Sequence, residues 1–317
     1  MKKIYFIGLF SFCSLFFSCD QNNNFQNSTV EIVSQPIKSS TKVKPPENLV
    51  KALKSVEPFF QLMGKPKPDE WLANFKEDGQ TFEQYIDSSP ILPTADRKIL
   101  YIQPLGKFDQ NQMKIIELTA EYMSVFFNLP VKILKEKAFA KQLSLKNYRV
   151  DKFSKTTQIR TRFILDEVLQ PELPADAAAL IAFTTEDLYP EDDVRYVFGQ
   201  VNIETRVGVW SLFRLQKFAN FEHFLRRTLK IAVHETGHLF SMKHCTKYEC
   251  VMSGTNNLAE TYKRPIDACP ECMAKICWMT GYEPQKRYEH LSEFSKKSGL
   301  KKESDEFTKK KNAVYNY

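Results

Sequence analysis

The stretch HETGHLFSMKHC (residues 234–245) decides how the chain is expected to fold. His234 and His238 are four residues apart, which places both imidazoles on one face of a helix, where they can hold a single metal ion. His244 completes a set of three histidines if the helix ends just past His238 and the chain turns back. Three histidines and one water form the open coordination that is typical of catalytic zinc. Apolar or small residues at helical spacing support the helix: Leu225, Leu229, Ala232, Val233, Thr236 and Phe240.

Glu235 lies beside His234, just off the stripe of ligands. That position suits a general base acting on a metal-bound water rather than a fourth ligand. The alternative is a chance HExxH on an ordinary amphipathic helix, and the third histidine favours the metal site. His223 points the same way as His234 but lies about 16 Å away along the helix axis, so it cannot share the ion. We therefore predict that His223 and His290 are ordinary surface or packing histidines.

Four cysteines predict a second metal site. Cys245 and Cys250 form a C-x4-C pair, and Cys269 and Cys272 form a C-x2-C pair. Four thiolates in two such pairs make a closed tetrahedral zinc site, usually with a structural role. Disulfides are the alternative, because an export signal at the N-terminus implies an oxidising compartment. The paired short spacings favour zinc. Cys277 is expected to be a buried thiol.

These residues resemble the archaemetzincins, metzincin-like zinc proteins in which HExxHxxGxxHC is followed by C-x-M and a later CxxC. The matching elements are HETGHLFSMKHC (234–245), CVM (250–252) and CPEC (269–272). Segments 184–190, 196–200 and 208–215 also look like parts of that family, so the resemblance covers roughly residues 95–285. It implies an α/β fold: a metzincin-like zincin domain with a mixed sheet, an active-site helix and a C-terminal segment bound to zinc by four cysteines.

The resemblance also implies the roles of individual residues. His234, His238 and His244 would bind the catalytic zinc, and Glu235 would be the base. Cys245, Cys250, Cys269 and Cys272 would hold a second zinc, giving two ions per chain. Met252 would be the Met-turn residue, an apolar floor under the histidines.

Two positions of the helix and its following turn are unusual. The family's glycine after the helix is replaced by Ser241. A left-handed backbone is expected there, and serine in that conformation costs about 1–2 kcal/mol. Gly237 lies inside the helix, where glycine costs about 1 kcal/mol against alanine. Close packing near the metal is the expected reason for Gly237.

Upstream of the metal motif, strands and helices are expected to alternate. Residues 98–106, 131–134, 177–183, 194–201 and 208–215 read as strands, and Asp109 can cap a helix. A further helical stretch is predicted around residues 157–169. This alternation predicts an α/β sheet with helices on its faces. By analogy with metzincin-like folds, residues 196–201 are expected to lie at the cleft edge, where an extended peptide can pair with a strand.

The two ends of the chain carry different signals. Residues 1–19 read as a lipoprotein signal peptide whose Cys19 becomes the lipidated N-terminus, and residues 20–47 as a flexible tether. Residues 48–95 are expected to be a helical N-terminal extension without an assigned function. The catalytic domain is predicted over residues 96–285. Residues 286–317, rich in lysine, are expected to be a charged C-terminal tail in the form of a solvated helix or loose chain.

Composition limits the classes of function. Of the 317 residues, 43% are hydrophobic and 13% aromatic, which is enough for a core, and the net charge of +7 is mild and dispersed. No basic helix or stacking platform argues for nucleic acid. We therefore predict a monomeric, zinc-dependent peptidase that cleaves peptide or protein substrates by Glu-assisted attack of zinc-bound water. It would be held at the cell envelope by an N-terminal lipid anchor in the membrane. The alternative is a non-catalytic, zinc-stabilised envelope binding module.

Overall fold

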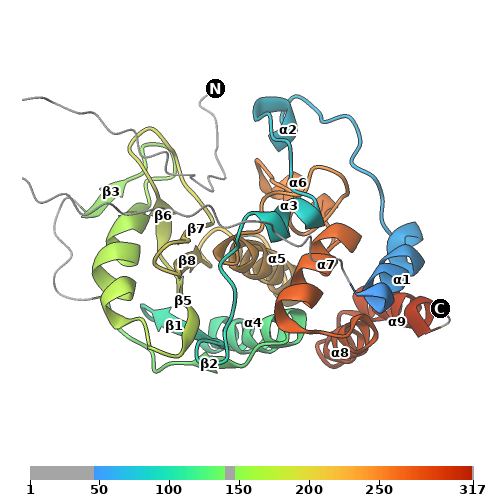
Figure 1. Cartoon of the computed structure of the whole chain (residues 1–317). Helices are drawn as coiled ribbons and strands as arrows, with labels where there is room; N and C mark the ends of the chain where they lie inside the picture. The colour runs from blue at the N-terminus through green and yellow to red at the C-terminus, as the bar shows by residue number, and fades with distance from the viewer. Residues whose placement is uncertain (1–45, 140–146, 316–317) are drawn as a thin grey trace, which may run out of the picture. The chain divides into compact units, whose positions relative to one another are not determined.

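The computed structural model describes residues 46–139 and 147–315 (Figure 1). Its central sheet has five strands in the order β2-β1-β5-β8-β7. The first four in that order run parallel, and β7 is antiparallel to β8 at the edge. The fold is therefore mixed α/β, as predicted. The strands are β1 (Ile99–Leu105), β2 (Val131–Ile133), β5 (Ala177–Thr184), β7 (Gly199–Asn202) and β8 (Val207–Ser211).

Helices cover both faces of this sheet. On one face lie α4 (Gln110–Phe127) and α5 (Phe221–Leu239), which run side by side in Figure 1. The predicted cap of α4 is confirmed, because Asp109 and Gln112 form a capping box. On the other face, the π-helix η3 (Phe163–Leu169) packs its apolar residues against Leu180, Val207 and Val209. The resulting two-sided burial explains why β5 is apolar along its whole length.

Three predicted elements differ from the structure. The helix expected around residues 157–169 begins instead as a strand, β4 (Thr157–Arg160), which pairs with β3 (Tyr148–Val150) and β6 (Asp187–Tyr189) in a second sheet. Of the strand expected over residues 194–201, only the last part joins the sheet, as β7. The strand expected over residues 208–215 corresponds to β8 and ends at Ser211. Buried Asp187 holds this region together by accepting hydrogen bonds from Arg214 (2.6 and 2.7 Å) and Gln158 (2.9 Å).

The N-terminal extension contains less helix than expected. Its elements are α1 (Glu47–Val56), η1 (Glu57–Phe59), α2 (Trp71–Asn74) and α3 (Phe82–Asp87). Prolines and polar residues keep the connections between them non-helical. Several aromatic side chains of this segment are buried: Trp71, Phe82 and Tyr85.

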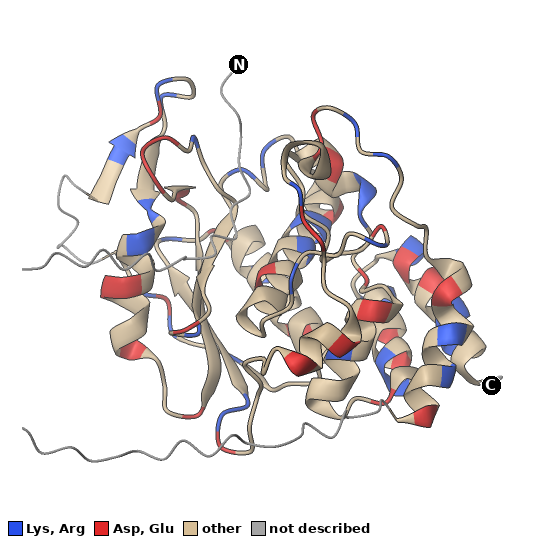
Figure 2. Ribbon diagram, turned by 45° about the horizontal axis from the view of Figure 1, so that its top comes forward, with Lys and Arg blue, Asp and Glu red and all other residues tan. Residues whose placement is uncertain are grey.

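The C-terminal tail is helical, one of the two forms expected, but its helices are partly buried and not simply solvated. After α6 (Leu258–Lys263) and α7 (Pro270–Thr280), the chain forms α8 (Pro284–Lys297) and α9 (Lys301–Tyr315). Both helices bury apolar residues at helical spacing: Tyr288, Leu291, Phe294 and Phe307. The many lysines around these residues hide that spacing in the sequence. Figure 2 shows basic and acidic residues interspersed along this part of the chain. Within the described ranges, no helix is long and apolar enough to cross a membrane.

A buried ionic cluster attaches the last helices to the domain. The Asp267 carboxylate accepts from Arg287 (3.0 Å) and from Lys310 (2.8 Å), and all three side chains are buried. Burial alone would raise the pKa of Asp267, but Lys310 and Arg287 outweigh it and hold that pKa below its usual value. The folded state therefore gains stability from ionised Asp267 above about pH 4, and loses it as the pH falls through the folded-state pKa.

We expect Asp267→Asn to destabilise the chain by about 3–5 kcal/mol at pH 7, because two buried cations lose their anion. Urea unfolding measures this change. Exposed Asp305 on α9 provides the control, Asp305→Asn, which should change stability by less than about 0.5 kcal/mol. The difference between wild type and Asp267→Asn should shrink below pH 4. An equal difference at pH 3 and pH 7 would contradict the role given to the carboxylate charge.

Candidate metal centre

The end of α5 positions the histidines. The helix begins at Asn220, whose side chain accepts from His223 N (2.9 Å), and its buried second half carries His234 and His238. It stops because Ser241 has φ +62, the left-handed turn that was expected there. The turn reverses the direction of the chain, so that His244 lies beside His234 and His238. The Ser241 hydroxyl accepts from Ile91 N (3.0 Å), a contact that glycine cannot make.

The three histidines converge on one point. Their ligand atoms lie within 4.8 Å of one another, and the Nε2 atoms of His234 and His238 are 3.0 Å apart. Each Nδ1 faces an acceptor: Val251 O (2.8 Å) for His234, Met242 O (2.7 Å) for His238 and the Glu77 carboxylate (2.9 Å) for His244. Because these acceptors have no hydrogen to give, each Nδ1 is the donor, which leaves each Nε2 to face the shared point.

Three converging Nε2 atoms fit a metal ion. Burial, together with the nearby His244, lowers the pKa of His234 to about 3. Burial also lowers the pKa of His238 well below its usual value. Both rings are therefore neutral, and neutral Nε2 atoms in close contact repel unless a cation lies between them. Neutral imidazoles with a fixed tautomer are the form in which histidine binds zinc. His223 and His290 are exposed, as predicted.

Glu235 lies next to this centre and is 5% exposed. Burial raises the pKa of Glu235 to about 8. The edge strand β7 passes close to it: a Cβ added at Gly199 would stand 3.3 Å from Glu235 Cγ and 3.1 Å from Val209 O. The expectation that residues 196–201 lie beside the site is thus met at Gly199. No room is left there for a side chain.

Met252 packs directly under α5. A Cβ at Gly237 would stand 2.6 Å from the Met252 sulfur and 2.8 Å from its methyl carbon. The predicted reason for Gly237, close packing near the histidines, is confirmed. Met252 also receives a hydrogen bond at its carbonyl from Cys245 N (2.8 Å), which connects it to the next cluster.

The four predicted cysteines come together. Cys245, Cys250, Cys269 and Cys272 are buried with their sulfur atoms within 4.8 Å of one another. The described cysteines form no disulfide, and the Cys245 and Cys269 sulfurs are 3.6 Å apart. Two thiolates on a tetrahedral zinc stand about 3.8 Å apart, because each Zn–S bond is about 2.3 Å, whereas a disulfide requires about 2.05 Å.

The backbone around the cysteines also favours a thiolate. The Cys250 sulfur accepts from Cys269 N (3.2 Å) and Met252 N (3.4 Å). Hydrogen bonds from neighbouring thiols, that of Cys250 first, lower the pKa of Cys245. Cys277 is buried, and burial raises its pKa to about 12, so it remains a protonated thiol, as predicted.

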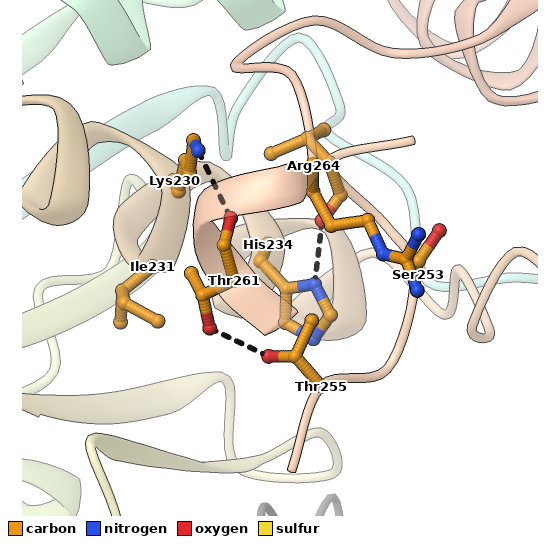
Figure 3. Close-up of a pocket in the computed structure, with 8 residues that line it drawn as sticks. Lys230, Ile231, His234, Ser253, Thr255, Thr261 and Arg264 are labelled. Atoms are coloured by element: carbon orange, nitrogen blue, oxygen red, sulfur yellow. Dashed lines mark hydrogen bonds between the residues drawn. The ribbon is translucent and has the colours of Figure 1, made fainter. Parts of the chain in front are cut away.

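A small cavity lies beside His234 (Figure 3). Its floor includes the Lys230 ammonium, which donates to the carbonyls of Thr261 (2.9 Å) and Tyr262 (3.3 Å). Burial lowers the pKa of Lys230 to about 8. Thr255 and Thr261 share a hydrogen bond of 2.9 Å on the opposite wall. The cavity therefore presents polar and basic groups next to the candidate ligand His234.

Glu77 and Trp71 lie at the site although no sequence motif points to them. Glu77 contacts His244 across 167 positions, and the Trp71 ring meets the His244 ring edge-on at 5.2 Å. No spacing rule connects residues so far apart. Only the turn at Ser241 and the path of the N-terminal extension bring them together.

The mixed sheet and the helix with paired histidines beside a buried glutamate define a zincin-type metallopeptidase. The chain belongs to peptidase family M54, the archaemetzincins, whose family model matches residues 112–277. It is 29% identical over 259 residues to archaemetzincin-2 of Homo sapiens, covering 71% of each chain. It is 31% identical over 177 residues to archaemetzincin of Archaeoglobus fulgidus, covering 56% of this chain and 98% of that one. The chain is therefore a zinc metallopeptidase.

Solved structures of the same family resemble the chain. The crystal structure of Archaeoglobus fulgidus archaemetzincin complexed with malonate shares 30% identity, with a TM-score of 0.45 over 56% of this chain and 99% of that one. The Methanopyrus kandleri structure shares 26% identity, with a TM-score of 0.48 over 60% and 99%. The family match begins after the N-terminal extension and ends before α8, so Glu77 and Trp71 lie outside it.

We expect Gly237→Ala to lower stability by about 1–3 kcal/mol, although alanine favours helix, because its methyl group would overlap Met252. Thermal melting of the zinc-loaded chain measures the change. Gly64→Ala is the matched control: a Cβ there meets nothing within 4 Å, so its effect should stay within about 0.5 kcal/mol. A more stable Gly237→Ala chain would show that Met252 moves away without cost.

Proposed function

We propose that the chain hydrolyses peptide bonds at a zinc ion held by His234, His238 and His244, with Glu235 as the general base. The observation that carries this proposal is the convergence of three histidine Nε2 atoms beside a buried carboxylate. Three histidines and one water complete the coordination of zinc, so no fourth protein ligand is needed. Zinc bound there would polarise the substrate carbonyl and lower the pKa of a water molecule to about 7.

Glu235 moves the proton in this proposal. Its carboxylate takes a proton from the attacking water and gives it to the leaving nitrogen, so that it is ionised again at the end. Burial raises its pKa, so the group holds the proton readily between these two steps. A nearby cation favours the ionised form at the start.

The edge strand β7 gives the substrate a place to bind. An extended peptide can add to β7 through backbone hydrogen bonds, since β7 has a strand partner in the sheet on one side, β8. The absence of a side chain at Gly199 lets β7 approach Glu235 closely, so a peptide added to β7 would run beside the proposed base. This arrangement supports peptides or proteins as substrates.

A second zinc, at Cys245, Cys250, Cys269 and Cys272, has a structural role in this proposal. The cluster is buried and has four protein ligands, so no position remains for a substrate. It would hold the loop after His244 against α7, and so keep the third histidine in place.

We further propose that the chain is a monomeric lipoprotein of the cell envelope, anchored through Cys19. The support comes from the sequence of residues 1–19 and the polar stretch that follows, all of which lie outside the described residues. Cys19→Ser should abolish incorporation of labelled palmitate and move the protein from the membrane to the soluble fraction. Cys13→Ser is the control and should leave both unchanged. Labelling of Cys19→Ser equal to wild type would exclude this anchor.

We expect Glu235→Gln to reduce peptide cleavage by at least about 10²–10⁴-fold while the chain keeps two zinc ions. Glutamine has the same shape but cannot accept the proton. Metal analysis and cleavage of a broad peptide library, on the same preparations of the full chain, measure both quantities.

The same measurements separate the alternatives. If the wild-type chain binds two zinc ions but cleaves no peptide, the non-catalytic binding module becomes the better hypothesis. If the chain binds one zinc ion and none of the four cysteines reacts as a free thiol, the cysteines form disulfides and do not bind zinc. Cleavage by Glu235→Gln at the wild-type rate would remove Glu235 from the mechanism.

A further inference from the structure

The N-terminal clasp, defined here as residues 61–91, lies along the loop that carries the third histidine. Its first part pairs with residues 247–249: Glu249 N donates to Gln61 O (2.8 Å) and Met63 N to Lys247 O (2.9 Å). Its last part reaches the turn after α5, where Ile91 N donates to the Ser241 hydroxyl (3.0 Å). The clasp therefore contacts this loop on both sides of His244.

Within the clasp, Glu77 accepts a hydrogen bond from a candidate zinc ligand. Its carboxylate oxygens lie 2.9 and 3.0 Å from His244 Nδ1. The other two histidines are oriented by backbone carbonyls, at Val251 and Met242. His244 is thus the one member of the three whose partner carries a full charge and is supplied by a distant part of the chain.

Trp71 encloses this contact. Its ring stands edge-on to His244, with 5.2 Å between ring centres, and its backbone N–H donates to the buried Glu260 carboxylate (3.0 Å). A Cβ at Gly254 would stand 2.5 Å from Trp71 Cδ1, so the ring lies directly on the backbone after Met252. These contacts leave His244 with a side chain only 9% exposed.

We propose that Glu77 is a positioning residue for the zinc site, an inference that rests on the proposed function of His244 as a ligand. The Glu77 carboxylate holds the proton on Nδ1 of His244 and turns Nε2 toward the point shared with His234 and His238. A carboxylate partner also makes the imidazole a stronger ligand. The N-terminal clasp, although outside the family match, is thereby part of the metal centre.

A role limited to surface stability predicts a different result. Glu77 is 28% exposed, and pairs of this kind near the surface contribute little to stability. If Glu77 acts only as such a pair, its removal changes melting slightly and zinc affinity not at all. If it positions His244, zinc affinity falls while the metal-free chain melts as before.

The experiment measures metal affinity in the full chain, without substrate. Chelator competition with zinc gives the affinity, and cobalt(II) substitution separates the two sites, since only the cysteine site shows thiolate-to-cobalt charge transfer. We expect Glu77→Gln to weaken binding at the histidine site by about 10-fold and Glu77→Ala by up to about 100-fold, with the cysteine site unchanged. Glutamine keeps an acceptor without the charge, which explains the order.

Asp78→Asn is the matched control: it removes the neighbouring carboxylate, which is exposed, and should leave both sites at wild-type affinity. Wild-type zinc affinity and an unchanged cobalt d–d spectrum in Glu77→Ala would overturn the proposal. Equal weakening of both sites would overturn it too, since that marks a general loss of folding. Failure of the proposed peptidase activity can be told apart from failure of the Glu77 proposal. In the first case the wild-type chain binds zinc at the histidines but cleaves nothing.

Discussion

The left-handed turn at Ser241 is the constraint on which the centre depends. An α-helix can present two ligands at positions four apart, but its geometry carries any later residue along the axis and away from them. The reversal immediately after α5 brings His244 back beside His234. Ser241 adopts φ +62 at the cost of a conformation that glycine adopts freely. Its hydroxyl gains the hydrogen bond from Ile91 N in return, so the strained residue is fixed by the N-terminal clasp.

The loop after α5 connects the histidine cluster to the cysteine cluster. His244 and Cys245 are adjacent, and Cys250 precedes Val251, whose carbonyl orients His234. The Cys250 sulfur in turn accepts the N–H of Met252, which packs on Gly237 in the middle of α5. A change at the sulfur atoms therefore shifts the carbonyl and the methionine that hold the histidines. The two clusters cannot vary independently.

The sequence predicted those parts of the centre that depend on local spacing. HExxH, the third histidine and the two cysteine pairs are each set by distances of a few residues along the chain, and the structure brings each group together. The left-handed turn at Ser241 was expected because the resembled family has glycine there, and the close packing at Gly237 was expected because glycine is costly inside a helix.

Features that depend on tertiary context were missed or misjudged. Glu77 meets His244 across 167 positions, with no pattern to connect them. Residues 157–160 read as helix because their strand partner β6 lies 29 positions further along the chain. The C-terminal segment read as solvated because its lysines outnumber the apolar residues that α8 and α9 bury. Only the buried Asp267 reveals that Arg287 and Lys310 belong to the interior.

The clasp also has a consequence for the order of assembly. Ribosomal synthesis produces residues 61–91 well before the loop that they contact, since Ile91 and Ser241 are 150 positions apart. Until α5 and the cysteine loop have formed, the clasp has no surface to pair with, and contacts that close such long stretches of chain form late in folding. The histidine centre is therefore expected to mature late, when the clasp meets a loop that is synthesised 150 positions after it.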